Sequence, residues 1–131
     1  MKHGHGRFKW NDGSMFEGEF VAGKMEGYGS YTWTDGRKYE GDWNDNMMHG
    51  KGVFTFDDGR IYEGDYFMDK KEGHGIFAWP DGKLYEGGWH QGRQHGKAAY
   101  KNGKGVIKFG EWDNGKRIRW FEEGANPQER A

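Results

Sequence analysis

Polar and apolar residues alternate in short segments that recur every 23 residues along the chain. Residues 39–43 read Tyr-Glu-Gly-Asp-Trp, so that the rings and the glycine fall on one face of an extended strand and the carboxylates on the other. Residues 53–56 read Val-Phe-Thr-Phe and alternate in the same way. Each unit therefore predicts two antiparallel strands, and no segment has the longer period of an amphipathic helix.

Turn signals separate these strands at the same interval. Asp-Gly pairs follow the second strand of each unit, and glycine accepts the positive φ that a tight hairpin turn demands. The pairs stand at residues 12–13, 35–36, 58–59 and 81–82. Between Trp43 and Gly50 the pattern is less regular, and we expect a seven-residue link that faces solvent.

The pattern predicts an all-β fold, an elongated single-layer antiparallel β-hairpin solenoid of about 5.5 repeats. With no side chain at Gly41 or Gly52, the aromatic ring of a neighbouring strand could lie flat across the backbone. We expect the array to span residues 1–121, followed by a tail at 122–131. Its units are a half repeat at 1–15, full repeats at 16–38, 39–61, 62–84 and 85–107, and a divergent half repeat with a cap at 108–121.

Composition supports an aromatic core and argues against several functions. Aromatic residues make up 18% of the 131 residues, and 20 basic residues nearly balance 21 acidic ones, which opposes both disorder and nucleic-acid binding. The chain contains no cysteine, which excludes disulfides and zinc-thiolate sites and fits an intracellular, reducing compartment. No apolar run is long enough for a spanning helix, and the first residues do not form a signal peptide.

Repetition also argues against a catalytic or metal site. Every unit offers the same carboxylate, whereas catalysis needs one asymmetric group of residues. A second series with ligand-type side chains has members about 10 Å apart, too far for one zinc ion. We therefore expect no catalytic residues, no cofactor and no metal. The carboxylate series is Glu17, Glu40, Glu63 and Glu86, and the second series is His3, Glu26, His49, Glu72 and His95.

Two surfaces are candidates for partner binding. A single layer cannot bury both of its faces, so its aromatic face could form a groove for a helix or an extended peptide. Methionines at one edge could instead form a docking patch or pack locally, since Met surfaces adapt to partners. The groove candidates are Tyr31, Trp33, Tyr39, Trp43, Phe54, Phe56, Tyr62, Tyr66, Phe77, Trp79, Tyr85 and Trp89. The edge candidates are Met47, Met48, Phe67 and Met68.

Residues 39–59, with Tyr-Glu-Gly-Asp-Trp, His-Gly-Lys-Gly, an aromatic-Thr-aromatic segment and Asp-Gly, resemble the MORN repeat (membrane occupation and recognition nexus). The resemblance covers about residues 3 to 119. It implies a β-hairpin solenoid without catalytic activity of its own. Relatives occur in ciliary radial spokes, cytoskeletal scaffolds, a class III myosin complex and junctional membrane proteins, and as appendages of lipid kinases and a lysine methyltransferase.

The pattern departs from this family near both ends. Lys108 and Phe109 stand where Tyr and Glu are expected, which predicts a bulge or a local slip. Residues 118–121 are expected to cap the last hairpin, whereas residues 1–10 supply only half a unit and leave an open strand edge.

We expect a non-catalytic structural or protein-interaction module of a large assembly, in the cytoplasm or cytoskeleton and, by resemblance, in the ciliary axoneme. One alternative is a peripheral membrane module that binds anionic phospholipid. The near-zero net charge disfavours that reading. The other alternative is a regulatory repeat region of a larger enzyme.

Overall fold

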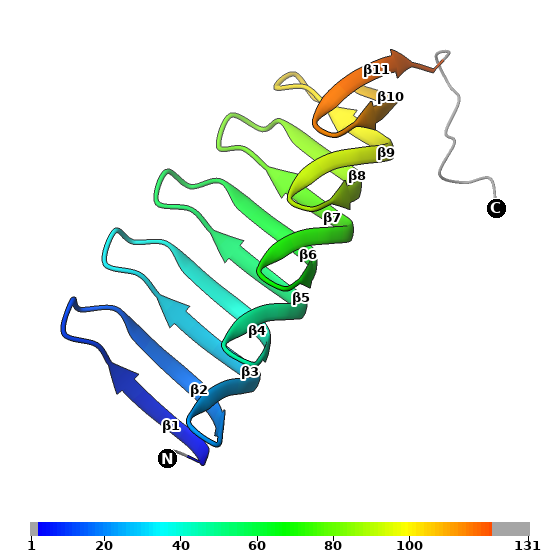
Figure 1. Ribbon diagram of the computed structural model, residues 1–131. Coiled ribbons are helices and arrows are strands. Elements are labelled where there is room, and N and C mark those ends of the chain that lie inside the picture. The colour runs from blue at the N-terminus through cyan, green and yellow to red at the C-terminus, as the bar shows by residue number, and fades with distance from the viewer. Residues whose placement is uncertain (1–2, 122–131) are drawn as a thin grey trace.

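The computed structural model describes residues 3–121, which form one open antiparallel sheet (Figure 1). Its 11 strands lie side by side in chain order, and the described residues contain no helix. The predicted all-β, single-layer repeat is confirmed. The predicted tail at 122–131 lies outside the described residues. The strands are β1 (Gly4–Lys9), β2 (Met15–Val21), β3 (Lys24–Thr32), β4 (Lys38–Asn44), β5 (Met47–Thr55), β6 (Ile61–Phe67), β7 (Lys70–Ala78), β8 (Leu84–His90), β9 (Arg93–Lys101), β10 (Ile107–Asp113) and β11 (Lys116–Trp120).

Turns of one kind join the odd-numbered strands to the following even-numbered ones, and the first four of them contain the Asp-Gly pairs. In the turn between β3 and β4, the Gly36 amide donates to the Trp33 carbonyl at 3.2 Å, and the Trp33 amide donates to the Arg37 carbonyl at 2.9 Å. Gly36 has φ +98°, which only glycine adopts without strain. The Asp35 carboxylate accepts a hydrogen bond from the Arg37 amide at 3.1 Å, which explains why Asp precedes the glycine.

The second kind of turn lies where the sequence suggested a seven-residue link, and that prediction is wrong. Strand β4 runs to Asn44 and β5 begins at Met47, so only Asp45 and Asn46 form the turn. Both have positive φ, 53° and 66°, as in a type I′ hairpin turn. Residues 44–49 look irregular in sequence because the two strands bend there while they remain paired.

That bend follows a β-bulge in every hairpin. The strand register shifts just after the central glycine of each even-numbered strand, as at Gly41/Trp43, and Figure 1 shows the ends beyond this point curving out of the plane of the sheet. A bulge was predicted only for the divergent unit at residues 108–112. It occurs at Glu111/Trp112, but the same irregularity recurs in the four preceding hairpins, so the divergent residues are not its cause.

Each curved end is fastened to the preceding hairpin by hydrogen bonds. The Asn46 amide donates to the Met25 carbonyl at 3.2 Å, and the Met25 amide donates back to Asn46 Oδ1 at 2.8 Å. Asp69 and Met48 repeat this exchange one unit later, at 2.9 and 2.7 Å. These bonds continue the ladder beyond the flat sheet and set the inward curvature.

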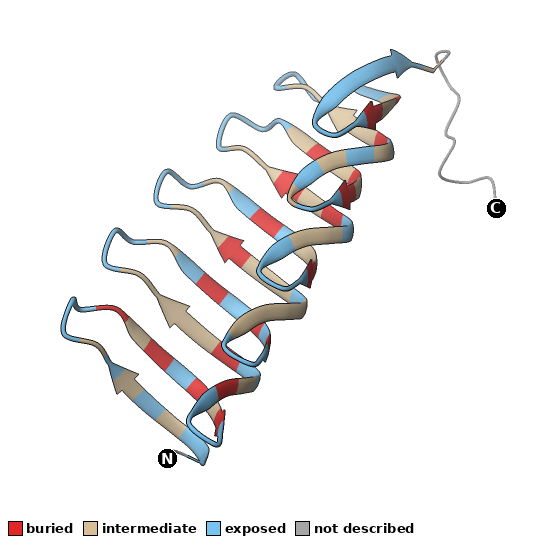
Figure 2. Cartoon of the chain, in the orientation of Figure 1, coloured by how far each residue is buried: buried red, intermediate tan, exposed pale blue. Residues whose placement is uncertain are grey.

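The core lies on the inner face of this curve. Figure 2 shows buried positions alternating with exposed ones along the strands. Phe16, Tyr39, Tyr62 and Tyr85 share one repeat position and are fully buried. The other buried apolar residues are Phe20, Met25, Trp43, Phe54, Tyr66, Phe77, Trp89, Ala98 and Trp112.

A row of glycines lies beneath these rings and makes the close packing possible. Gly41 and Gly52 are direct partners across β4 and β5, and a Cβ on Gly52 would overlap the Tyr39 ring. The prediction that a ring lies across these glycines is confirmed. The Tyr39 hydroxyl donates to the Asp42 carbonyl at 2.9 Å, and Trp43 Nε1 donates to the Gly29 carbonyl at 3.1 Å, so the polar atoms of both rings have partners.

The last strand covers the end of the core. Trp120 on β11 packs edge-on against Trp112, with ring centroids 5.7 Å apart, and the Phe121 amide donates to the Phe109 carbonyl at 2.8 Å. Phe109 lies on the outer face, in the position that carries glutamate in the preceding repeats.

Candidate binding groove

Aromatic rings form a continuous stripe along the inner face, in which Phe54 and Phe77 are buried and the other rings are partly exposed. Neighbouring rings alternate between the strands and the Asp-Gly turns, with centroids 4.6 to 5.6 Å apart. Rings held this closely are ordered before any partner binds. We call this set the aromatic stripe: Phe8, Trp10, Tyr31, Trp33, Phe54, Phe56, Phe77 and Trp79.

A groove lies between the aromatic stripe and the curved ends of the hairpins. One hollow in it, with a volume of 290 Å³, is bounded by Tyr31 and Trp33 on the stripe side and by Asn46, Met48 and Asp69 on the side of the curved ends. A second hollow of 300 Å³ lies near β11 and is lined by Tyr100, Trp112, Arg117 and Trp120. We use the name inner groove for the strip of the inner face between the aromatic stripe and the curved ends, on which both hollows lie.

The structure divides the twelve predicted groove residues into two groups. Eight are buried in the core that the curved ends and the flat part of the sheet enclose, a feature that a flat layer would lack: Tyr39, Trp43, Phe54, Tyr62, Tyr66, Phe77, Tyr85 and Trp89. The other four keep partial exposure and are the ones that a partner could contact: Tyr31, Trp33, Phe56 and Trp79.

Three further residues belong to the accessible part of this face and were missed. Phe8 occupies the repeat position of Tyr31 and is partly buried against the core. Trp10 occupies the repeat position of Trp33, and Tyr100 occupies that of Tyr31; both are partly buried against the core. Their register in the repeat was the signal that could have identified them. In the last unit Asn102 takes the position of Trp33, so the tryptophans and phenylalanine of the Asp-Gly turns end at Trp79.

The predicted edge residues do not form one patch. Met48 points into the inner groove and packs against the core, and Met47 is half-buried on the adjacent strand position. Phe67 and Met68 lie at a hairpin tip and are 53% and 52% exposed. The Phe67 ring contacts the tilted His49 ring with centroids 5.3 Å apart, so this tip offers a small apolar surface apart from the groove.

Cations lie over the rings of the inner groove. The Arg60 guanidinium is 4.5 Å from the Phe56 ring and the Arg37 guanidinium 5.2 Å from the Trp33 ring. The Lys71 ammonium lies 5.6 Å from the Tyr62 ring and 5.4 Å from the Trp89 ring. Burial lowers the pKa of Lys71, and the nearby Arg60 lowers it further.

Comparison of the sequence with models of known protein families identifies the family of this chain. The model of the MORN repeat matches residues 1–15, 16–36, 39–59, 62–83 and 85–105. The chain belongs to the MORN-repeat family. MORN repeats are typical of protein-interaction or membrane-association modules, and the family is generally non-enzymatic. No curated protein matches the chain significantly.

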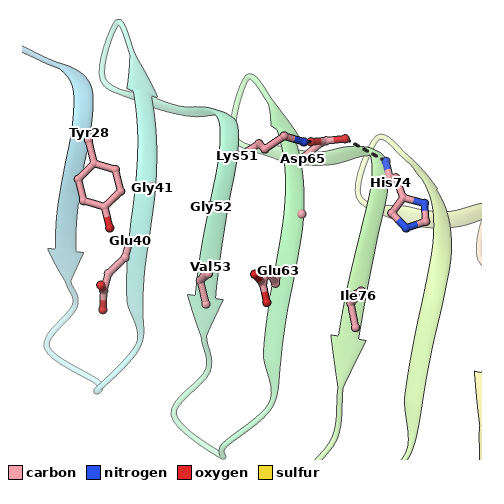
Figure 3. A pocket seen from close by; sticks show the side chains of 11 residues that line it. Tyr28, Glu40, Gly41, Lys51, Gly52, Val53, Glu63, Asp65, His74 and Ile76 are labelled. Carbon is pink, nitrogen blue, oxygen red and sulfur yellow. Dashed lines mark hydrogen bonds and ion pairs between the residues drawn. The ribbon is translucent and has the colours of Figure 1, made fainter.

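The outer face of the MORN array carries a shallow hollow of 440 Å³ across β3 to β7 (Figure 3). Glu40 and Glu63 flank Val53 on neighbouring strands. Asp65 lies at one side, where Lys51 Nζ is 2.6 Å from Oδ1 and the His74 amide donates to Oδ2 at 3.3 Å. Burial alone would raise the pKa of Asp65, but these hydrogen bonds hold it below its usual value. The hollow is therefore open to solvent and contains the ion pair between Lys51 and Asp65.

The histidine and glutamate series that suggested a metal site has a structural role in the MORN repeats. Glu26 Oε1 accepts a hydrogen bond from the Asp45 amide at 3.0 Å, and His95 Nδ1 accepts one from the Asn114 amide at 3.3 Å. His3 and Glu72 contact the equivalent turn amides at 3.2 and 3.4 Å. These four side chains thus cap the type I′ turn of the following hairpin, whereas His49 contacts the Phe67 ring. Among residues 3–121, no three ligand-type side chains converge on one point, and no helix is long and apolar enough to cross a membrane.

Proposed function

We propose that the chain is a non-catalytic interaction module that docks a helix or an extended peptide of a partner protein in the inner groove. The observation that carries this proposal is the aromatic stripe, whose rings contact one another in sequence while all of them except Phe54 and Phe77 remain partly open to solvent. Large rigid rings bury much area at little entropic cost, and for this reason they dominate the energetics of protein interfaces.

The spacing of the repeats favours an elongated occupant. Trp33, Phe56 and Trp79 recur once per hairpin, about 10 Å apart for two strands of the sheet. A segment that lies along the stripe would meet an equivalent aromatic contact in each successive repeat. Several moderate contacts of this kind add up over a length that no single pocket provides.

We place this module within a larger intracellular assembly, of the cytoskeleton or the ciliary axoneme. The support is the resemblance to MORN proteins of such assemblies and the absence of cysteine from the sequence. The same resemblance leaves attachment to a larger enzyme as an alternative setting for an identical docking role.

Binding to anionic phospholipid is less well supported by the described residues. A lipid surface requires unpaired cations gathered on one face, whereas several of the cations outside the groove lie beside carboxylates. Lys24 is 2.6 Å from Asp45, and Lys38 is 2.9 Å from Glu40. Vesicles that contain phosphoinositides test this alternative, and salt-sensitive binding to them would favour it over the docking of a polypeptide.

Site-specific crosslinking tests the groove directly. A photoreactive phenylalanine analogue at position 56 faces the groove, and the same analogue at position 61 faces the opposite side of the sheet. We expect crosslinks to a partner polypeptide from position 56 and none from position 61. Replacing Trp33 and Trp79 by alanine should weaken the crosslink while thermal unfolding shows a folded array. Crosslinks from position 61 alone, or from neither position, would contradict the proposal.

A further inference from the structure

One repeat position in the inner groove changes its chemistry along the array. It follows the type I′ turn and lies opposite an aromatic residue of the preceding strand, as Met48 lies opposite Trp43. Met25 fills this position in the first hairpin and is 9% exposed. Lys71 occupies it in the third hairpin, opposite Tyr66. An ammonium group therefore stands where the two preceding repeats place a methionine side chain.

The Lys71 ammonium has no carboxylate partner among residues 3–121, since none lies within ion-pair distance. Arg37 and Arg60, which lie over the aromatic stripe, each have one: Arg37 Nε is 2.8 Å from Asp35 and Arg60 Nε is 2.7 Å from Asp58. The nearby positive charge of Arg60 repels that of Lys71 and so disfavours the charged form of the lysine. Within the described part of the chain, its ammonium lies over the Tyr62 and Trp89 rings.

The position of Lys71 places this charge beside the surface that a docked segment would cover. Trp89, one of its two ring contacts, is 6.0 Å from Phe77, and Phe77 is 4.6 Å from Trp79. Phe77 and Trp79 belong to the aromatic stripe. A polypeptide on the stripe would therefore pass next to the ammonium group and remove it further from water.

We propose that Lys71 binds a carboxylate of the docked segment, so that the occupant of the inner groove is an acidic amphipathic polypeptide. This inference rests on the proposed docking function. The occupant would place apolar side chains on the stripe and an Asp or Glu opposite Lys71. A half-buried cation forms a strong charge-assisted hydrogen bond with a carboxylate, and a basic segment would be repelled by Lys71 and Arg60 together.

The carboxylates near the groove do not compete for this role. Asp69 lines the hollow of the preceding repeat, but its Oδ1 accepts a hydrogen bond from the Met48 amide and helps to fasten the curved end. Asp35 and Asp58 hold the guanidinium groups that lie over Trp33 and Phe56. The groove thus offers an unmatched positive charge at Lys71.

A displayed library of random peptides provides the probe. Peptides selected on the full chain are expected to combine aromatic or aliphatic residues with an acidic residue at a constant place. The test variant is Lys71→Met, which restores the residue of the two preceding repeats and should fold normally. The matched control is Lys70→Met, which removes the same charge from an exposed neighbour. Selected peptides should bind Lys71→Met about tenfold or more weakly and should bind Lys70→Met unchanged.

A second readout follows the ammonium group itself. Because a bound carboxylate favours the charged form, the pKa of Lys71 should rise when a selected peptide binds, as seen by NMR of the labelled side chain. A merely structural role of Lys71 would leave its pKa unchanged by the peptide.

The possible results separate the two proposals. If no selected peptide depends on Trp33 and Trp79, the docking function itself fails. If peptides depend on these tryptophans but lack a constant acidic residue and bind Lys71→Met with full affinity, docking stands and the role of Lys71 is refuted. Peptides that contain a constant basic residue would also overturn the proposed acidic occupant.

Discussion

Glycine and tyrosine act as one structural unit in each repeat. The Tyr39 ring covers the space that a side chain on Gly52 would occupy, and the Tyr39 hydroxyl then bonds the Asp42 carbonyl. The flexible backbone of this glycine lowers the stability of the folded state, and the ring that packs over it compensates for that loss. Ala98 stands at the repeat position of Gly52 and is fully buried, so the last repeat accommodates one methyl group there.

A branched side chain at this position should disrupt the packing. We expect Gly52→Val to lower the free energy of unfolding by about 1 to 3 kcal/mol, as overpacking of a core does, because the valine would overlap the Tyr39 ring. Denaturant unfolding of the purified chain measures the change.

Gly6 provides the matched control for this substitution. It holds the same repeat position on the edge strand β1, and a Cβ there would meet no atom within 4 Å. Gly6→Val should therefore leave the stability within about 0.5 kcal/mol of the original. Equal losses in the two variants would show that the strand glycines matter for backbone reasons and not for the ring.

At the scale of the hairpin, the two kinds of turn carry different backbone demands. The Asp-Gly turns place glycine where φ is positive, but the type I′ turns often do not. Met68 has φ +50° at the first position of its turn, and long side chains adopt this conformation at a cost. Its side chain is 52% exposed, so packing offsets little of that cost.

Asparagine should relieve this strain, because it tolerates the left-handed conformation and is favoured in type I′ turns. We predict that Met68→Asn raises the free energy of unfolding by about 1 kcal/mol, which thermal or denaturant unfolding can measure. Lys70→Asn, in the extended strand two residues away, should give no gain. A loss of stability in Met68→Asn would mean that the methionine side chain contributes packing at the tip.

At the scale of the molecule, buried tyrosines make the stability of the array depend on pH in the alkaline range. Burial raises the pKa of Tyr39, Tyr62, Tyr66 and Tyr85 well above that of an exposed phenol. These rings belong to three successive repeats, and rings of neighbouring repeats contact one another. Ionisation of one buried tyrosine should therefore also weaken the packing of the adjacent repeats.

The array should therefore lose stability in alkali. Below about pH 10, tyrosine is neutral in both states; above it, the unfolded chain releases protons that the folded chain retains. The free energy of unfolding should then fall by up to about 1.4 kcal/mol per pH unit for each tyrosine. Denaturant unfolding from pH 8 to 12 measures this slope.

Tyr62→Phe should make the slope shallower, and phenylalanine already occupies the equivalent position at Phe16. Tyr28→Phe, at an exposed position on the outer face, should not change it. A slope that is insensitive to Tyr62→Phe would show that other groups cause the alkaline unfolding.

The local features of this protein could be derived from sequence. The alternation in residues 39–43 determines which side chains share a face, since side chains of a strand alternate whatever surrounds them. The Asp-Gly pairs mark turns because glycine alone accepts their φ without strain. The repeat of 23 residues then determines a sheet of hairpins with rings over glycines.

Tertiary structure decided how that sheet bends and what its faces offer. The curved ends depend on hydrogen bonds between adjacent hairpins, such as those from Asp45 to Glu26 and from Met25 to Asn46, 19 and 21 residues apart. Period-2 alternation holds no information on such contacts, because they depend on the bulge and the curvature that it produces. For this reason both Trp43 and Trp33 were predicted to line the groove, whereas in the folded chain curvature buries Trp43 and leaves Trp33 at the groove, where a partner could reach it.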